Sequence, residues 1–247
     1  MSFPSTLRAA YDVIVIGAGP AGLAAATTSA QAGLATLLVD ENQAPGGQIY
    51  RAITFSPLKN SPVLGKDYEA GASLVSACEQ SGADYVAGCT VWSLDRERVV
   101  GLSRGGEARL IKAERVIIAT GAMERPFPIP GWTLPGVMTI GAGQTMLKSS
   151  GLIPEGRVVL AGQGPLLWLY AAQVLRAGGT IAAICDTTPL KNYVDAAPYL
   201  PAFLLSPYWS KGLGLIREVK RKVKIITGIT KLAAEGAKLV DAGVEMI

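Results

Sequence analysis

Histidine is absent from the 247-residue sequence. The chain therefore provides no imidazole general base, no histidine metal ligand and no Ser-His catalytic triad. Its three cysteines, Cys78, Cys89 and Cys185, lie far apart and form no CxxC pair. This spacing excludes a locally encoded redox dithiol or zinc knuckle and fits a reduced, cytoplasmic setting. Redox chemistry in this chain would have to come from a bound cofactor.

Charged residues are also few, at 17%, whereas hydrophobic residues make up 49% and glycine occurs 29 times. Such a composition is typical of an α/β protein with buried parallel strands. No aromatic residues interleave with the basic run at 220–224, so we expect a solvated helix face there and no nucleic-acid site. The uncharged run at 158–175 approaches transmembrane length, but Gly162 and Gly164 would break a helix, so we expect no membrane span.

The clearest pattern is a strand, turn, helix and strand near the N-terminus. Residues 13–16 are a β-branched run, typical of a strand buried on both faces of a parallel sheet. The turn Gly17-Ala18-Gly19-Pro20-Ala21-Gly22 follows, then an Ala-rich helix to residue 32 and a strand at 37–39. Asp40 ends that strand, 23 residues after Gly17. This order predicts a βαβ unit that binds a dinucleotide.

Each position in this unit has a separate physical reason. Gly17 permits the tight turn, Gly19 lets a pyrophosphate approach the backbone, and Gly22 lets the helix pack closely on the sheet. The helix N-terminus offers unpaired N–H groups to the phosphates. Asp40 can accept hydrogen bonds from a ribose diol, with Glu41 as a fallback. A turn without a ligand would explain Gly17 but not the acid.

Two later segments are further candidates for contact with the same ligand. Gly46, Gly47 and Gln48 follow the second strand, and adjacent glycines indicate either a backbone close to a ligand or an ordinary turn. Residues 115–118 predict another buried strand, which ends in Ala119-Thr120-Gly121. Ligands in open parallel sheets bind at the carboxyl ends of strands, so these residues are placed to touch one, although a turn is the competing interpretation.

The rest of the first half predicts a helix at 67–81, a strand at 85–94 and a hairpin of strands 99–103 and 108–111. The Pro-rich connector at 126–132 cannot be helical and marks a domain boundary. We therefore expect an FAD-type domain at 1–126 and a second dinucleotide-type domain at 127–247.

The opening pattern recurs in the second half. A strand at 157–161 leads into Gly162-Gln163-Gly164-Pro165-Leu166-Leu167, a helix to residue 177, a strand at 180–185 and then Asp186. Leu167 occupies the place of the third small residue, where it would push the helix from the sheet or narrow a phosphate site. Nucleotide binding and a purely structural repeat both remain open. The expected fold class is α/β, with two Rossmann-like βαβ domains.

The two units, joined through the Ala-Thr-Gly strand and a Pro-Gly turn, resemble the two-dinucleotide-binding flavoprotein superfamily. The segments that carry a narrower resemblance include YDVIVIGAGPAGLAAA, VDENQAPGGQIYR, IIATGAMERPFPIPGWTLPGVMT and GRVVLAGQGPLLWLYAAQVLRAGG. They are similar to the α subunits of multi-subunit amino-acid dehydrogenases of the opine oxidase, D-hydroxyproline dehydrogenase and hydrogen cyanide synthase type. The resemblance covers roughly residues 11–190. Chains of that family are longer, so this chain is expected to be C-terminally incomplete within its second domain.

The resemblance implies FAD in the first unit, although related α subunits hold another adenine nucleotide there. It implies NAD(H) as a second cofactor in the second unit. The implied cofactor-binding residues are Gly17, Gly19, Pro20, Ala21 and Gly22 at the pyrophosphate, Asp40 at the ribose, Gly47 and Gln48 along the ribityl and flavin side, Thr90 and Val91 at the adenine, Ala119, Thr120 and Gly121 over the cofactor, and Gly162, Gly164, Pro165 and Asp186 at the second site.

The implied function is a flavin-dependent oxidoreductase in a hetero-oligomer, where a β subunit oxidises an amine or amino acid. The flavin carries the chemistry, so no catalytic side chain is expected. Two alternatives stay open. One is an NAD(P)H-dependent flavin reductase. The other is a non-catalytic nucleotide-binding scaffold that binds partner subunits through the aromatic region 193–209.

Overall fold

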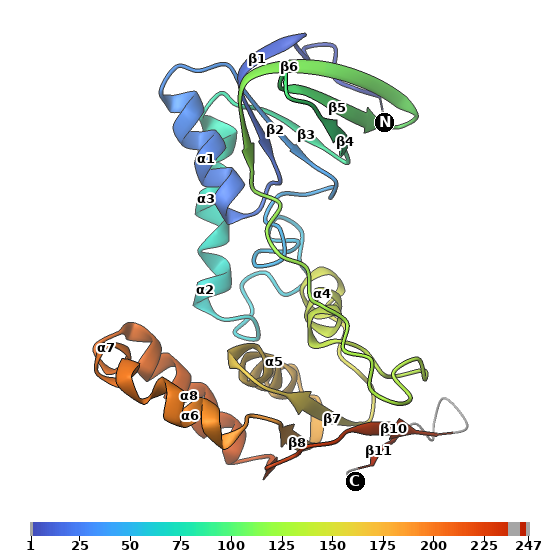
Figure 1. Ribbon diagram of the computed structural model, residues 1–247, viewed down its shortest axis with the longest axis vertical. Helices are drawn as coiled ribbons and strands as arrows, with labels where there is room; N and C mark the ends of the chain where they lie inside the picture. The colour runs from blue at the N-terminus through green and yellow to red at the C-terminus, as the bar shows by residue number, and fades with distance from the viewer. Residues whose placement is uncertain (1, 237–242, 246–247) are drawn as a thin grey trace. The chain divides into compact units, whose positions relative to one another are not determined.

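The computed structural model describes residues 2–236 and 243–245. The chain divides into two compact units (Figure 1): unit 1 comprises 1–123 with 148–151, and unit 2 comprises 124–147 with 152–247. The first passage between the units thus falls at 123/124, and residues 148–151 return to unit 1. The assignment of two domains divided at 126/127 stays a prediction.

Unit 1 is built on a six-stranded sheet with the order β3-β2-β1-β6-β5-β4. The strands are β1 (Ala10–Ile16), β2 (Thr36–Asp40), β3 (Asp84–Ala87), β4 (Thr90–Leu94), β5 (Val99–Arg104) and β6 (Glu107–Ile118). β1 runs parallel to β2 and β6, whereas β4, β5 and β6 form an antiparallel meander. The β-branched run at the start of the chain thus lies in the middle of the sheet, where Ile14 and Val15 are fully buried.

Three helices belong to unit 1: α1 (Pro20–Gln31), α2 (Lys66–Glu69) and α3 (Gly71–Gln80). α1 and α3 lie side by side on one face of the parallel strands (Figure 1). The predicted helix at 67–81 is divided at Ala70, where the Cα of Gly71 packs against the ring of Tyr50. The parallel arrangement brings the carboxyl ends of β1, β2 and β6 to one edge.

The strand predictions of unit 1 need two corrections. The single strand expected at 85–94 is two strands, because Gly88 has a φ of +62° and turns the chain between β3 and β4. The strands expected at 108–111 and 115–118 are one, β6, in which Lys112 pairs with Val99 of β5 and with Ala10 of β1. The first half of β6 completes the hairpin and the second half joins the parallel sheet.

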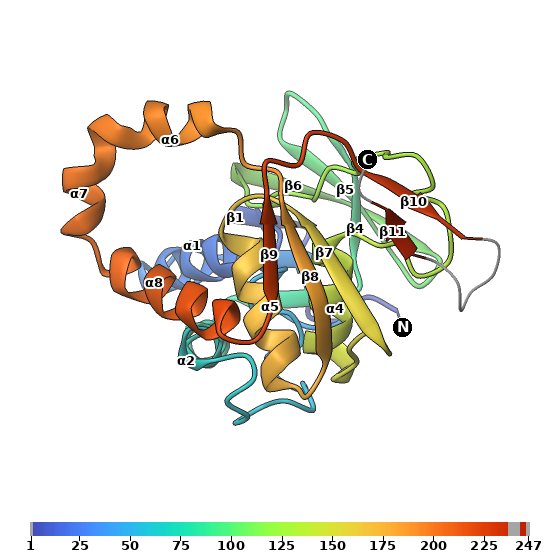
Figure 2. The ribbon, with the colours of Figure 1, turned by 90° about the horizontal axis from the view of Figure 1, so that it is seen from below.

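Unit 2 contains a three-stranded parallel sheet with the order β7-β8-β9 (Figure 2). Its strands are β7 (Arg157–Gly162), β8 (Thr180–Asp186) and β9 (Lys224–Thr227), and a separate antiparallel pair is formed by β10 (Ala233–Glu235) and β11 (Gly243–Glu245). Its helices are α5 (Pro165–Arg176), α6 (Leu190–Ala196), the 3-10 turn η1 (Ala197–Tyr199), α7 (Leu200–Leu204) and α8 (Pro207–Lys220). α4 (Ile140–Ser150) starts in this unit and ends in unit 1.

α5 is the helix that fills the core of unit 2. Leu167, Tyr170 and Val174 are almost completely buried on it. Arg176 near its end donates two hydrogen bonds, of 2.9 and 2.6 Å, to the carboxylate of Glu218 on α8. The second strand–turn–helix–strand pattern therefore folds as expected. Within the described residues, no helix is long and apolar enough to cross a membrane.

Candidate dinucleotide site

The first glycine turn connects β1 to α1 with little room for side chains. Gly17 has a φ of +102°, and a Cβ on it would lie 2.5 Å from the carbonyl oxygen of Ala119. A Cβ on Gly22 would overlap the carbonyl oxygen of Gly17. Both glycines are thus required by the packing of the turn against β6 and of α1 against the turn, as the sequence predicted for Gly17 and Gly22.

Gly19 differs from its neighbours because its free side is open. A Cβ on Gly19 would meet only the Cα of Gly47, at an ordinary 3.8 Å. It precedes Pro20, which begins α1, so the unpaired amides of the first helical turn lie next to this space. This is the geometry that the approach of a phosphate to the backbone requires.

A second glycine segment packs directly on the first. The amide of Gly46 donates to the carbonyl oxygen of Ala18 at 2.8 Å. Gly47 has a φ of +59°, and a Cβ on it would lie 2.8 Å from the Cα of Gly19. Residues 46–47 therefore pack beside the first turn, and their contact with a ligand stays a prediction. Gln48 is exposed on this segment.

Asp40 connects the end of β2 to the first glycine turn. Its Oδ2 accepts a hydrogen bond of 2.5 Å from the amide of Ala18, and its Oδ1 accepts bonds of 2.7 Å from the amide and the side chain of Asn42. The carboxylate is 7% exposed. Two carboxylate oxygens offer about four acceptor sites, so one remains for a ribose hydroxyl. Glu41 is exposed, and its fallback role stays a prediction.

The remaining residues expected at the first site lie at the same edge of the sheet. Ala119 follows β6 and donates its amide to Ile16 at 2.8 Å, whereas Thr120 and Gly121 are exposed. Thr90 and Val91 begin β4, just after Cys89, whose amide donates to the carbonyl of Asp40 at 2.9 Å. A hollow of about 340 Å³ lies here, lined by Gln43, Gly88, Arg104 and Gly105. Thr90 and Val91 are not among its lining residues, so their contact with adenine stays a prediction.

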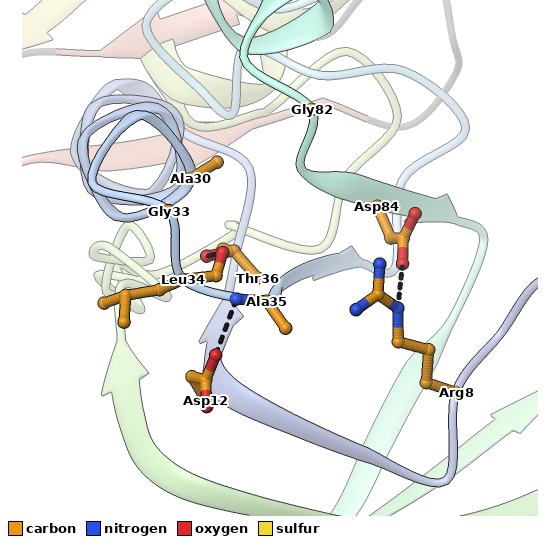
Figure 3. A pocket seen from close by; sticks show the side chains of 9 residues that line it. All are labelled: Arg8, Asp12, Ala30, Gly33, Leu34, Ala35, Thr36, Gly82 and Asp84. Carbon is orange, nitrogen blue, oxygen red and sulfur yellow. Dashed lines mark hydrogen bonds and ion pairs between the residues drawn. The ribbon is translucent and has the colours of Figure 1, made fainter.

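Another pocket, of about 260 Å³, lies at the opposite end of the strands (Figure 3). Asp12, Thr36 and Asp84 from the starts of β1, β2 and β3 line it. Asp12 accepts a hydrogen bond of 2.7 Å from Ala35, and Arg8 lies 3.8 Å from Asp84. Because ligands of open α/β sheets bind at the carboxyl ends of strands, this pocket is no candidate for the dinucleotide.

The second glycine turn is much looser than the first. Gly162 and Gly164 have φ values of +144° and +90°, and a Cβ on either would meet no atom within 4 Å. Pro165 begins α5, and Leu167 is buried in the core and 1% exposed. Unit 2 therefore accommodates a leucine in its core at the position where unit 1 has the close-packed Gly22.

Asp186 ends β8 as Asp40 ends β2, but it makes different contacts. Its Oδ1 accepts hydrogen bonds from the amide and hydroxyl of Thr188, at 2.9 and 2.5 Å. The second glycine turn is instead linked to the end of β8 by a backbone hydrogen bond, in which the amide of Thr187 donates to the carbonyl oxygen of Gly162 at 3.0 Å. Within 2–236 and 243–245, the carboxylate of Asp186 makes no hydrogen bond to its glycine turn.

Three polar residues of the first site were missed by the sequence reasoning: Asn42, Arg51 and Lys148. Asn42 links Asp40 to Arg51, and Lys148 donates to the carbonyls of the segment after Gly47. Arg51 had a local signal, because it is a cation four residues after Gly47. Lys148 had none, because its contacts lie about one hundred residues away in sequence.

The cysteines take no part in this site. All three are buried and form no disulfide, and burial raises the pKa of Cys89 to about 11. The thiolate form of Cys89 is therefore scarce at neutral pH. Within 2–236 and 243–245, no group of three or more cysteine, aspartate or glutamate side chains could hold a metal ion.

The first site fits the diphosphate of an adenine dinucleotide. It offers free helix amides, an open face at Gly19, and a buried Nε on Arg51 that has no hydrogen-bond partner in the described chain. A phosphate oxygen is the acceptor that these donors require.

A parallel sheet, a glycine turn open at a helix N-terminus and an acid at the end of the next strand define a Rossmann-type dinucleotide-binding protein, here with a second such unit. The model of the pyridine nucleotide-disulphide oxidoreductase family matches residues 11–182, and the chain belongs to that family. This membership confirms the predicted fold class and the resemblance to the two-dinucleotide-binding flavoproteins.

Among its relatives, the A-type subunit of opine oxidase from Agrobacterium tumefaciens is 44% identical over 96% of this chain and 49% of that protein. Hydrogen cyanide synthase subunit HcnB from Pseudomonas aeruginosa is 35% identical over 70% of this chain and 38% of its own length. The structure of L-proline dehydrogenase from P. horikoshii matches 72% of this chain and 36% of that one, with a TM-score of 0.60 and 22% identity, which supports the fold. The chain thus spans about half the length of its opine oxidase relative.

Proposed function

We propose that this chain is the FAD-binding α-type subunit of a multi-subunit amino-acid dehydrogenase, located in the cytoplasm. The observation that carries the proposal is the 44% identity to an opine oxidase subunit over 96% of the chain, which includes the whole first glycine turn. A catalytic β subunit would oxidise the amine or amino-acid substrate. The three cysteines form no disulfide within the described residues, which supports a reducing compartment.

In this proposal the residues of unit 1 bind and orient the cofactor. The amides that follow Gly19 meet the diphosphate, Asp40 fixes the turn and meets the ribose, and Thr90 and Val91 border the adenine. FAD, when bound, supplies the redox chemistry, and the residues of this chain bind and orient it. Gly47, Gln48 and the segment Ala119-Thr120-Gly121 border the cofactor on the side of the ribityl chain and flavin.

The full chain, purified and titrated with FAD, is expected to bind one equivalent and to give a yellow protein, because the first turn is preformed. The measurement is the flavin absorbance band after gel filtration, with the extracted cofactor identified by mass. A native complex containing this chain should reduce an electron-accepting dye with amines or amino acids. A chain that neither carries nor takes up FAD would overturn the proposal.

A second candidate function, reduction of the flavin by NADH, is favoured by one observation, the acidic residue at the end of β8. An acid at this place selects the free ribose of NADH over the phosphorylated ribose of NADPH. If unit 2 binds NADH, the flavin absorbance of the FAD-loaded chain should bleach rapidly, and Gly164→Val should slow the bleaching about tenfold or more. No bleaching at millimolar NADH would set this candidate aside.

A further inference from the structure

Arg51 is connected to the first glycine turn by a chain of hydrogen bonds. Its Nη1 donates to the Oδ1 of Asn42 at 2.7 Å, and the Nδ2 of Asn42 donates to the Oδ1 of Asp40 at 2.7 Å. The other oxygen of Asp40 accepts from the amide of Ala18 at 2.5 Å. The guanidinium is therefore held in a fixed relation to the backbone amides of the turn.

The guanidinium of Arg51 is incompletely satisfied. Its Nε is buried and has no hydrogen-bond partner within the described chain, and the bond to Asn42 uses one of its five N–H groups. A buried donor of a charged group without an acceptor is costly, and an acceptor supplied by a ligand would remove that cost. The side chain as a whole is only half-buried, which leaves it accessible to a ligand. A guanidinium matches the geometry of phosphate oxygens by paired hydrogen bonds.

Lys148 holds the segment that carries Arg51. Its Nζ donates to the carbonyl oxygens of Gln48 and Ile49, at 3.0 Å each, and the residue is 6% exposed. Those carbonyls directly follow Gly47, which packs on Gly19. Lys148 thus anchors the backbone of the Gly46–Arg51 segment, two and three residues before Arg51.

Two positive charges therefore meet at one short segment. Burial, together with the positive charge of Arg51, lowers the pKa of Lys148 to about 8, and Arg51 is the charged group that acts on it. An anion bound between the segment and the turn would relieve both the repulsion and the incomplete bonding of Arg51.

We propose that Arg51 binds the diphosphate of the adenine coenzyme directly, and that Lys148 is a positioning residue that holds the Gly46–Arg51 segment against the first glycine turn. This inference rests on the proposed FAD site. It adds to that site a positively charged side chain, Arg51, from outside the glycine turn. The ligand chemistry is the diphosphate that FAD and ADP share, so both nucleotides should depend on Arg51 equally.

The test compares the full-length wild type with Arg51→Gln, and uses Arg96→Gln, at an exposed position, as the matched control. Affinities for FAD, ADP and adenosine are measured by calorimetry. Arg51→Gln should weaken FAD and ADP by about 10- to 100-fold and leave adenosine unchanged, because only the phosphate contact is lost. Arg96→Gln should bind all three like the wild type. Arg51→Lys keeps the positive charge but loses the paired hydrogen bonds, so its affinities for FAD and ADP should lie between those of the wild type and Arg51→Gln. If Arg51→Gln does not fold, Arg51→Lys provides the test.

The role of Lys148 has a separate readout, the protons taken up on binding. A bound anion raises the pKa of Lys148, so ADP binding at pH 8.5 should take up part of a proton, and wild-type affinity should fall by up to about tenfold as pH rises from 8 to 9.5. Lys148→Met should lose both effects, and Lys59→Met, at an exposed site, should keep them. A purely structural lysine would change affinity without changing the proton count.

The outcomes separate this inference from the proposed function. If the wild type binds FAD and ADP and Arg51→Gln binds them equally well, the inference is wrong and the proposed FAD site stands. If the wild type binds neither nucleotide, both are rejected. Equal proton uptake by the wild type and Lys148→Met would remove the positioning role alone.

Discussion

Replacing Gly22 by alanine is expected to lower the free energy of unfolding of unit 1 by about 3 kcal/mol and to abolish FAD binding. The added methyl group would overlap the carbonyl oxygen of Gly17, which is backbone and cannot turn away. Helix α1 would have to move off the turn, and the amides at its N-terminus would move with it. Denaturant unfolding of the full chain, with hydrogen exchange of the α1 and β1 peptides, measures the loss.

Gly19→Ala is the matched control within the same turn. Its methyl group would lie 3.8 Å from the Cα of Gly47 and would meet nothing closer, so folding should stay within about 0.5 kcal/mol of the wild type. FAD binding should still weaken at least about tenfold, because the methyl group occupies the open face that a phosphate needs. If Gly22→Ala and Gly19→Ala had the same effect on stability, the close packing of α1 on the turn would be contradicted.

The first βαβ unit could be predicted because its determinants are local. A β-branched run, three glycines, an Ala-rich helix and an acid lie within 28 residues, from Val13 to Asp40, and each restricts the backbone where it stands. β6 could not be predicted as one strand. Its first half pairs with β5 and its second half with β1, so its continuity depends on partners far apart in sequence.

The polar contacts of the site were harder to predict for the same reason. The contact of Lys148 with Gln48 and Ile49 joins α4 to a segment about one hundred residues earlier, and no spacing rule connects them. Asn42 and Arg51 form a hydrogen bond across a turn whose shape is set by Gly46 and Gly47. Sequence patterns locate the backbone that meets a ligand, whereas the charged side chains that complete a site depend on the tertiary fold.

The two glycine turns have similar sequence patterns but differ at the third small position, which is Gly22 in unit 1 and Leu167 in unit 2. In unit 1, Gly22 allows α1 to meet the turn, and Asp40 bonds to the amide of Ala18. In unit 2, Leu167 is buried in the core, and Asp186 bonds to Thr188 instead of the turn. The first acid therefore stabilises its turn, while the second is available for another role at the end of β8.

Asp40→Asn is expected to lower the free energy of unfolding of unit 1 by about 3 kcal/mol, whereas Asp186→Asn should cost unit 2 about 1 kcal/mol or less. Both oxygens of Asp40 accept hydrogen bonds, from Ala18 and Asn42, so an amide NH₂ would face a donor on either side. Asp186 accepts from Thr188 through Oδ1, and an amide oxygen can replace that oxygen. Hydrogen exchange during denaturant unfolding measures the stability of each unit separately. Peptides from β1 and α1 report on unit 1, and peptides from β7 and α5 report on unit 2. Equal losses in the two variants would show that the carboxylate of Asp40 does not hold the first glycine turn.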